Sequence, residues 1–176
     1  MSSRGPRLQD PTKKPLALVG FMGSGKSVVG SLVAGRTGAP LFDLDQMIQI
    51  EAGTSIADIF ATLGEPAFRE LEARLVPAAL QPGAIAALGG GSLIDDASWK
   101  LVAARAVTIY LEVPFDTIWE RIRNLSGRPL ASGRSRDEVE SLFERRRPRY
   151  EQAQHRVDGD RPPPQVADEV IKLWSA

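Results

Sequence analysis

Apolar and polar residues follow two different periods along this chain. Short runs of apolar or β-branched residues, typical of buried strands, alternate with longer stretches in which apolar residues recur every three or four positions, as on one face of a helix. The strand-like runs occupy residues 16–19, 40–43, 84–88, 107–111 and 155–157. Strands and helices that alternate in this way predict an α/β fold with a parallel sheet covered on both faces, which binds ligands at the carboxyl ends of its strands.

Some helix boundaries and faces can be predicted from the same pattern. Ser55 is expected to cap a helix, because its hydroxyl can accept a hydrogen bond from the first turn. The prolines at residues 162–164 are expected to precede the last helix of the chain. One face of the helix after Ser55 should carry its apolar side chains, which are Ile56, Ile59, Phe60 and Leu63.

The composition suits one domain of ordinary size. The chain has 176 residues, of which 43% are hydrophobic, and this content is sufficient for a buried core. The 22 basic and 22 acidic side chains give a formal net charge of zero, so no overall attraction to nucleic acid or to an anionic membrane is expected. Cysteine is absent, which excludes disulfides and thiolate metal sites.

The first 14 residues differ from the rest of the chain. They are polar, contain Pro6 and Pro11 and have no apolar core, so we expect a disordered leader and no secretory signal. The chain has no run of about 18 apolar residues, so no membrane span is predicted. The predicted organisation is a leader over residues 1–14 and a single domain over residues 15–176.

The motif with the most specific chemistry lies directly after the first predicted strand. Residues 20–27 read GFMGSGKS and fit the pattern G-x-x-x-x-G-K-[ST] of a phosphate-binding loop, with a helical pattern behind them. Glycines allow the backbone N–H groups to wrap closely around phosphates. In such a loop Lys26 carries positive charge to the β- and γ-phosphates, and the Ser27 hydroxyl ligates Mg²⁺. The sequence therefore predicts an ATP or GTP site, against the alternative of a glycine-rich turn with a chance match.

Two carboxylates follow the second predicted strand. Asp43 and Asp45 have the spacing at which alternate side chains of a strand point to the same side of a sheet. One of them can then serve the metal ion, and the other can orient a substrate hydroxyl or accept its proton. Asp-x-Asp is also compatible with a solvated helix N-cap, so the spacing alone leaves both interpretations open.

Two further features are candidates for a substrate site. Arg69 and Glu72 lie one turn apart on a predicted helix, where they can pair while the arginine presents its planar guanidinium to a carboxylate. A surface ion pair is the plainer interpretation of that spacing. The three glycines at residues 89–91 directly follow a strand and suit a ligand that approaches the main chain closely, although a tight turn would also need glycine.

The composition and the periodicity of the sequence change after residue 123. The following stretch lacks periodicity and is rich in glycine, serine and arginine, so we interpret residues about 124–136 as a mobile lid. Arg128 lies beside Pro129 in this stretch, and a positive charge on a closing lid would stabilise transition-state charge and exclude water. A solvated charged face is the alternative for the many arginines of this region. We assign no chemistry to His155.

Taken together, these motifs resemble the shikimate kinase family. The resemblance implies a P-loop kinase fold of the nucleoside monophosphate kinase type, with a five-stranded parallel sheet flanked by helices and a mobile lid. It also implies transfer of the γ-phosphate of ATP to the 3-hydroxyl of shikimate, with Mg²⁺, on the route to chorismate and the aromatic amino acids. It covers roughly residues 16–174 and is carried by residues 20–27, 43–45, 55–60, 68–72, 89–91, 128–130 and 146–150.

The resemblance implies roles for the residues on the acceptor side. Asp45 would hold the shikimate hydroxyls, including the one that is phosphorylated. Arg69 and Arg146 would bind the shikimate carboxylate, and the glycine loop would lie along the substrate. The implied substrate-binding residues are Asp45, Arg69, Gly89, Gly90, Gly91 and Arg146.

The resemblance likewise implies roles on the nucleotide side. Mg²⁺ would be held by Ser27 and, through water, by Asp43, while Lys26 and the lid residue Arg128 would act on the phosphates and join Asp45 as catalytic residues. Arg121 would lie beside the adenine. The implied nucleotide-binding residues are Gly23, Ser24, Gly25, Lys26, Ser27, Val28, Arg121, Arg128 and Pro164.

The chain departs from the family pattern at two positions. Many relatives carry an arginine where a simple alignment places Pro162, which leaves that adenine contact open, whereas Pro164 fits the pattern. Val28 stands where the family usually has a threonine, but Ser27 retains the hydroxyl for the metal ion.

Two other functions remain as alternatives at this point. A gluconate-type sugar-acid kinase shares the phosphate loop and the size, but the segments 68–72 and 89–91 favour shikimate. A non-catalytic ligand-sensing module should carry a helix-turn-helix segment or lack acceptor-site residues, and this chain shows neither feature. We expect a cytoplasmic monomer whose partner is the small-molecule substrate, with no nucleic acid and no membrane.

Overall fold

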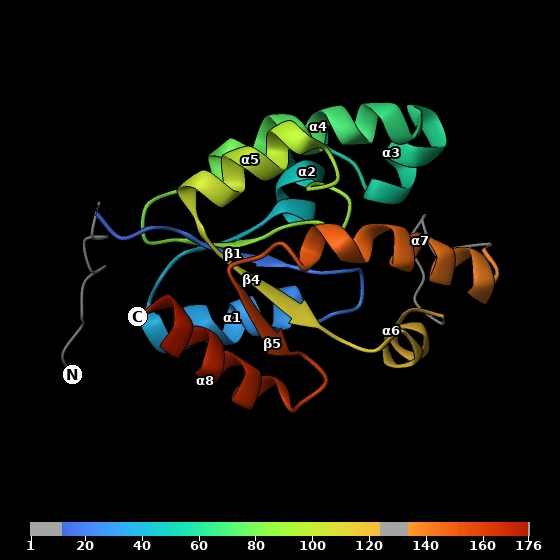
Figure 1. Cartoon of the computed structure of the whole chain (residues 1–176). Coiled ribbons are helices and arrows are strands. Elements are labelled where there is room, and N and C mark those ends of the chain that lie inside the picture. Colours follow the sequence, from blue (N-terminus) through green and yellow to red (C-terminus); the bar gives the residue numbers. More distant parts are fainter. Residues whose placement is uncertain (1–11, 124–133, 176) are drawn as a thin grey trace, which may run out of the picture.

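Five parallel strands form the centre of the structure, a computed structural model that describes residues 12–123 and 134–175 (Figure 1). The sheet has the order β2-β3-β1-β4-β5, and each neighbouring pair is parallel. The predicted α/β fold is therefore confirmed, and each strand lies where a short apolar run predicted it. The strands are β1 (Leu16–Val19), β2 (Leu41–Asp43), β3 (Ile85–Ala87), β4 (Val107–Glu112) and β5 (His155–Asp158).

The register of the strands brings several loops to one edge of the sheet. Leu16 on the central strand β1 is aligned with Ile85 on β3 and Val107 on β4, and Asp43 at the end of β2 is aligned with Ala87 at the end of β3. Because the strands are parallel, the phosphate-binding loop after β1 and the glycine loop after β3 leave the sheet side by side. The candidate site is therefore assembled at the carboxyl ends of adjacent strands.

Helices cover both faces of the sheet, as the continuous apolar strands predicted. Helices α1 (Lys26–Thr37) and α8 (Pro163–Trp174) lie on one face, and α2 (Leu44–Ala52), α4 (Gly64–Ala79) and α5 (Asp96–Arg105) lie on the other (Figure 1). The side chains of successive residues of β1 pack against the two helix layers alternately, because side chains alternate along a strand. Leu16 and Leu18 pack in the cluster with α1 and α8, whereas Ala17 and Val19 pack in the cluster with the other helices.

Three further helices complete the second layer. Helix α3 (Ile56–Thr62) precedes α4, and α6 (Phe115–Ile122) follows β4. Helix α7 (Arg136–Tyr150) begins with a capping box, in which the side chains of Ser135 and Glu138 each accept a hydrogen bond from the other residue's backbone N–H. Buried residues of all three helices belong to the same apolar cluster.

Two local expectations were wrong, and the structure decides between the interpretations left open for Asp43 and Asp45. Asp45 does not lie on a strand, because β2 ends at Asp43, whose carboxylate caps α2 and accepts from Asp45 N. Leu63 lies just beyond α3, and its side chain is 64% exposed instead of inward. Pro163 and Pro164 do not precede α8 but form part of its first turn, and only Pro162 lies before the helix. Proline is tolerated there because the backbone N–H groups of a first turn have no partner within the helix.

Some predictions lie outside the described residues. These are most of the leader, residues 124–133 of the expected lid, and with them Arg128. Over residues 12–123 and 134–175, no helix has the length and apolar character that a bilayer crossing requires.

The central strand should dominate the stability of the fold. We expect Leu18→Ala to lower the free energy of unfolding by about 2–5 kcal/mol, because Leu18 is fully buried and its truncation leaves a cavity under α1. Ile50→Ala is the matched control: Ile50 is 81% exposed, so the change should stay within about 0.5 kcal/mol. Urea unfolding of the two variants measures both values, and equal losses would contradict this account of the core.

Candidate active site

The phosphate-binding loop after β1 has a backbone that requires glycine. Gly23 and Gly25 have φ values of 80° and 93°, which side chains with a Cβ rarely adopt. A Cβ at Gly23 would also lie 2.7 Å from Cγ2 of Ile122 on α6. Helix α1 begins at the next residue after Gly25, so its N-terminal N–H groups face the loop.

Lys26 folds back over this loop. Its Nζ donates hydrogen bonds to the carbonyl oxygens of Gly20 at 2.8 Å and Phe21 at 2.9 Å. The ammonium group is thus held at the mouth of the loop, where the N–H groups and the charge can act on the same phosphate. This arrangement fits a nucleoside triphosphate.

A hydrogen bond joins Ser27, in the first turn of α1, to Asp43, the last residue of β2. The Ser27 hydroxyl donates to Asp43 Oδ2 at 2.5 Å, so a hydroxyl and a carboxylate share one side of the phosphate loop. Mg²⁺ prefers hard oxygen ligands and commonly takes one or two from the protein, with phosphates and water supplying the others. The pair fits such an ion, and over the described residues no cluster of three or more His, Cys, Asp or Glu side chains offers a fuller metal cage.

A cavity of about 390 Å³ joins the phosphate loop to the glycine loop. Asp45 reaches this cavity from the first turn of α2, and Arg121 reaches it from α6. Most of the residues expected to bind the nucleotide are therefore together. The cavity is lined by Met22, Gly23, Ser24, Gly25, Lys26, Ser27, Val28, Val29, Asp43, Asp45, Ala87, Leu88, Gly89, Gly90, Arg121, Gly159, Pro163 and Val166.

A second cavity of about 290 Å³ lies where the glycine loop continues. Arg69 comes from α4, Arg146 from α7 and Gly91 from the loop itself. These three residues are far apart in the sequence but line the same cavity. The lining consists of Glu65, Arg69, Glu72, Ala73, Gly91, Ser92, Ile94, Asp95, Ser98 and Arg146.

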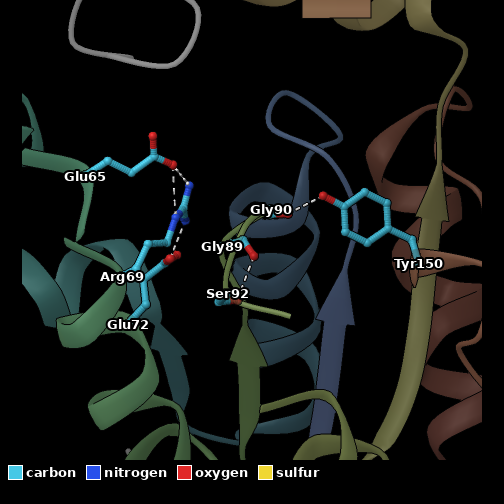
Figure 2. Close-up of polar contacts among 7 residues, drawn as sticks. All are labelled: Glu65, Arg69, Glu72, Gly89, Gly90, Ser92 and Tyr150. Atoms are coloured by element: carbon cyan, nitrogen blue, oxygen red, sulfur yellow. Dashed lines mark hydrogen bonds and ion pairs between the residues drawn. The ribbon is translucent and has the colours of Figure 1, made fainter. Parts of the chain in front are cut away.

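Two glutamates of α4 hold Arg69 in place (Figure 2). The predicted pair with Glu72 is present, and a second pair joins Arg69 Nη2 to Glu65 Oε1 at 2.9 Å. Sequence reasoning missed Glu65, although its i,i+4 spacing from Arg69 is a recognised signal for an ion pair. The guanidinium is therefore oriented by its own helix before any ligand arrives.

Two guanidinium groups and three carboxylates line this cavity. Burial lowers the pKa of Arg146, which is only 7% exposed, and the positive charge of Arg69 lowers this pKa further. Burial also acts to lower the pKa of Arg69, but the carboxylates of Glu72 and Glu65 outweigh it, and the pKa is raised. Two guanidinium groups that face one cavity from different helices suit a carboxylate, which can accept several charge-assisted hydrogen bonds.

The glycine loop passes very close to these charged groups. A Cβ at Gly89 would lie 2.7 Å from Glu72 Oε1 and 3.4 Å from Asp45 Oδ1. A Cβ at Gly91 would lie 2.1 Å from Arg69 Nη1, a distance at which the guanidinium would have to move. The three glycines therefore let the backbone pass close to these side chains; the close approach of a ligand stays a prediction.

The model of the shikimate kinase family matches residues 22–174 of this chain. The chain belongs to the shikimate kinase family. A shikimate kinase of Salinibacter ruber is 39% identical over 170 residues, which cover 90% of this chain and 83% of that protein. The family resemblance carried by the motifs is thus confirmed.

Solved shikimate kinases have the same fold. The enzyme of Acinetobacter baumannii, solved in complex with shikimate, aligns with a TM-score of 0.87 at 26% identity, covering 93% of each chain. The enzyme of Aquifex aeolicus aligns with a TM-score of 0.79 at 33% identity, covering 92% of this chain and 96% of that one.

The far end of the nucleotide cavity differs from the expectation drawn from the family. The cavity is lined by Pro163, whereas Pro164 is exposed and its carbonyl accepts a hydrogen bond from Arg36 at 2.8 Å. Pro162, which stands where many shikimate kinases carry an arginine, is the N-cap of α8. Arg161 beside it pairs with Glu169 of the same helix. Among the described residues, Pro163 and not Arg161 lines this cavity.

Arg121 lies at the same end of the cavity. Its Nη1 donates to the carbonyl of Gly23 at 3.1 Å, and its Nη2 pairs with Asp160 at 3.4 Å. These contacts connect α6, the phosphate loop and the segment before α8. The position is compatible with the adenine contact that the shikimate kinase family implies for this residue.

The buried Glu72 should make stability depend on pH. Burial raises its pKa above the ordinary value of 4.5, although the charge of Arg69 opposes this shift. The folded protein then binds this proton more tightly than the unfolded chain, so the stabilisation is fully present below pH 4.5 and is lost as pH rises through the raised pKa. We expect the stability of the wild type relative to Glu72→Gln to fall over that range.

Urea unfolding from about pH 4 to pH 8 measures this difference. Glu70→Gln is the matched control, since Glu70 is an exposed side chain of the same helix and its replacement should leave the pH profile unchanged. Parallel profiles for the wild type and Glu72→Gln would contradict the raised pKa.

Proposed function

We propose that this chain transfers the γ-phosphoryl group of ATP to the 3-hydroxyl of shikimate, giving shikimate 3-phosphate and ADP. One observation carries the proposal: the phosphate-loop cavity and the two-arginine cavity adjoin at the glycine loop, with Gly89 and Gly90 on one side and Gly91 on the other. A phosphoryl donor and an acceptor that carries a carboxylate could therefore bind in adjacent cavities. The relatives named above support the choice of shikimate.

On the donor side, the phosphates of ATP would lie in the loop from Gly20 to Ser27. Lys26 would neutralise charge on the β- and γ-phosphates, because its ammonium already lies over the loop. Ser27 and, through water, Asp43 would hold Mg²⁺, which shields the charge that develops on the phosphate oxygens. Arg128 would add a further charge from the lid, a role that stays a prediction from the family resemblance.

On the acceptor side, Arg69 and Arg146 would bind the shikimate carboxylate. Asp45 would contact the reacting hydroxyl, since it lines the donor cavity and its Oδ1 lies 3.4 Å from where a Cβ of Gly89 would be. In that position Asp45 can align the hydroxyl for in-line attack and accept its proton. Most of the rate enhancement would then come from positioning and charge stabilisation.

The biological setting follows from the family. Shikimate phosphorylation belongs to aromatic amino acid biosynthesis, so we infer a cytoplasmic enzyme that acts on a small molecule and needs neither nucleic acid nor membrane. We further propose that it works as a monomer with a single domain over residues 15–176, because donor and acceptor cavities are both lined by one chain.

A coupled assay of ADP release tests the proposed function directly. Purified protein is mixed with ATP, Mg²⁺ and one of three acceptors: shikimate, gluconate or a nucleoside monophosphate. We expect turnover with shikimate that exceeds turnover with the other acceptors by orders of magnitude. Preference for gluconate would favour the sugar-acid kinase, and tight shikimate binding without ADP release would favour the sensing module.

Lys26 and Arg69 should affect different kinetic constants. We expect Lys26→Ala to lower kcat by about a hundredfold or more, because it removes charge that acts on the transferred phosphate. Arg69→Ala should raise the KM for shikimate about tenfold or more with a smaller effect on kcat, because it removes charge-assisted hydrogen bonds to the carboxylate.

Arg74→Ala is the matched control for Arg69→Ala. Arg74 lies on the same helix, is 60% exposed and pairs with Glu51 outside both cavities, so its kinetics should equal those of the wild type. An unchanged KM for shikimate in Arg69→Ala would refute the carboxylate assignment.

Ser27 should set the requirement for magnesium. We expect chelation of divalent cations to abolish turnover and Ser27→Ala to raise the Mg²⁺ concentration needed for half-maximal activity about tenfold, since one oxygen ligand is lost. Ser31→Ala is the matched control, because Ser31 lies one turn further along α1 and its hydroxyl bonds to the Ser27 carbonyl. Superimposable Mg²⁺ titrations of the two variants would rule out this ligand.

A further inference from the structure

Tyr150 is a buried side chain that the proposed reaction does not use directly. It is the last residue of α7, its side chain has no exposed surface, and its ring stacks at an angle on Tyr110, with the ring centroids 5.7 Å apart. Its hydroxyl donates a hydrogen bond to the carbonyl oxygen of Gly90 (Figure 2). A residue 60 positions away in the chain is thereby attached to the centre of the glycine loop.

The hydroxyl of Tyr150 acts as a hydrogen-bond donor. Burial raises its pKa well above the ordinary value of 10, although the neighbouring Arg146 acts in the opposite direction. The raised pKa favours the protonated hydroxyl, which can donate this hydrogen bond. The hydroxyl supplies a hydrogen bond to the main chain of the glycine loop, and Arg146 also acts on it through a side-chain hydrogen bond.

Gly90 also lies close to the phosphate loop. A Cβ built at this position would lie 3.2 Å from the backbone nitrogen of Met22, 3.3 Å from the carbonyl oxygen of Gly20 and 3.3 Å from the Tyr150 hydroxyl. The same Gly20 carbonyl accepts a hydrogen bond from Lys26. Gly90 thus lies beside both the phosphate loop and Tyr150, and a side chain at this position would press against both.

Tyr150 and Arg146 belong to the same face of α7. They are four residues apart, so they lie one turn from each other, and both are buried. Arg146 lines the acceptor cavity, while Tyr150 holds the loop that separates this cavity from the phosphate loop. One helix face therefore places a substrate ligand and the loop along which the substrate would lie.

We propose that Tyr150 is a positioning residue that sets the distance between the acceptor site and the phosphate loop, through its hydrogen bond to Gly90. The proposal rests on the proposed function of the two cavities. Without the hydroxyl, the Gly90 carbonyl loses its buried donor, and the loop gains freedom to move away from the phosphate loop. The acceptor hydroxyl would then be misplaced relative to the γ-phosphate, whereas the nucleotide site would stay intact.

The test compares Tyr150→Phe with Tyr110→Phe in the full chain. Both substitutions remove one hydroxyl from the same pair of rings, but Tyr110 lines a separate groove with Glu112 and Phe115. We expect Tyr150→Phe to lower kcat/KM for shikimate about tenfold or more, as for loss of one buried hydrogen bond, and to change the KM for ATP less than about twofold. Tyr110→Phe should leave both constants at wild-type values.

Hydrogen exchange gives a readout that needs no substrate. In the ligand-free protein, the amides of residues 90–94 should exchange faster in Tyr150→Phe than in the wild type or in Tyr110→Phe, while those of the sheet should be unchanged. If the wild type does not phosphorylate shikimate, the proposed function fails but this exchange result still decides whether Tyr150 restrains the loop. Unchanged exchange in Tyr150→Phe, or equal losses on the ATP and shikimate sides, would overturn the positioning role.

A double substitution tests whether Tyr150 and Gly90 act as one unit. Gly90→Ala places a methyl group against both the phosphate loop and the Tyr150 hydroxyl, so it should itself lower kcat/KM for shikimate. In the double variant with Tyr150→Phe one of these close contacts is gone, and the loss should be smaller than the product of the single losses. Strictly multiplicative losses would show that the two residues act independently and would refute the proposal.

Discussion

The structure of the site depends on how closely the backbone of the glycine loop approaches its neighbours. Gly89 lies against the carboxylates of Glu72 and Asp45, and Gly90 lies beside both the phosphate loop and Tyr150. Gly91 lies under the guanidinium of Arg69. Any Cβ in this segment would force side chains or backbone to move, because the distances are below ordinary van der Waals contact. Donor and acceptor cavities can adjoin only because main chain, and no side chain, separates them.

Charge is distributed unequally across this boundary. The donor side has one ammonium over the phosphate loop, together with the Ser27 and Asp43 oxygens suited to a hard cation. The acceptor side has two guanidinium groups, one of them strongly buried, with glutamates orienting the other. Burial and the charge of Arg69 lower the pKa of Arg146, while the charges of Glu72 and Glu65 act in the opposite direction.

Much of the fold and the family could be predicted because the relevant signals are local. The glycine and lysine spacing of the phosphate loop reflects backbone geometry and phosphate charge within eight residues, and the apolar runs reflect burial of single strands. Errors and open alternatives arose where a signal depends on neighbouring structure. Asp43 ended a strand and capped a helix at once, and the sequence alone could not show which carboxylate did so.

The sequence by itself determined the order of strands and helices, the phosphate loop, the family, and the pairing of Arg69 with Glu72, since each depends on residues within a few turns of one another. The i,i+4 spacing of Glu65 and Arg69 is equally local, although it was missed. Only the tertiary structure decided that Pro163 and not Pro164 faces the nucleotide cavity, and that Tyr150 bonds to Gly90. The last contact joins residues 60 positions apart, and the packing of α7 against the end of the sheet creates it. No local periodicity encodes such a meeting, because it follows from the register of the parallel strands and the way the helices cover them.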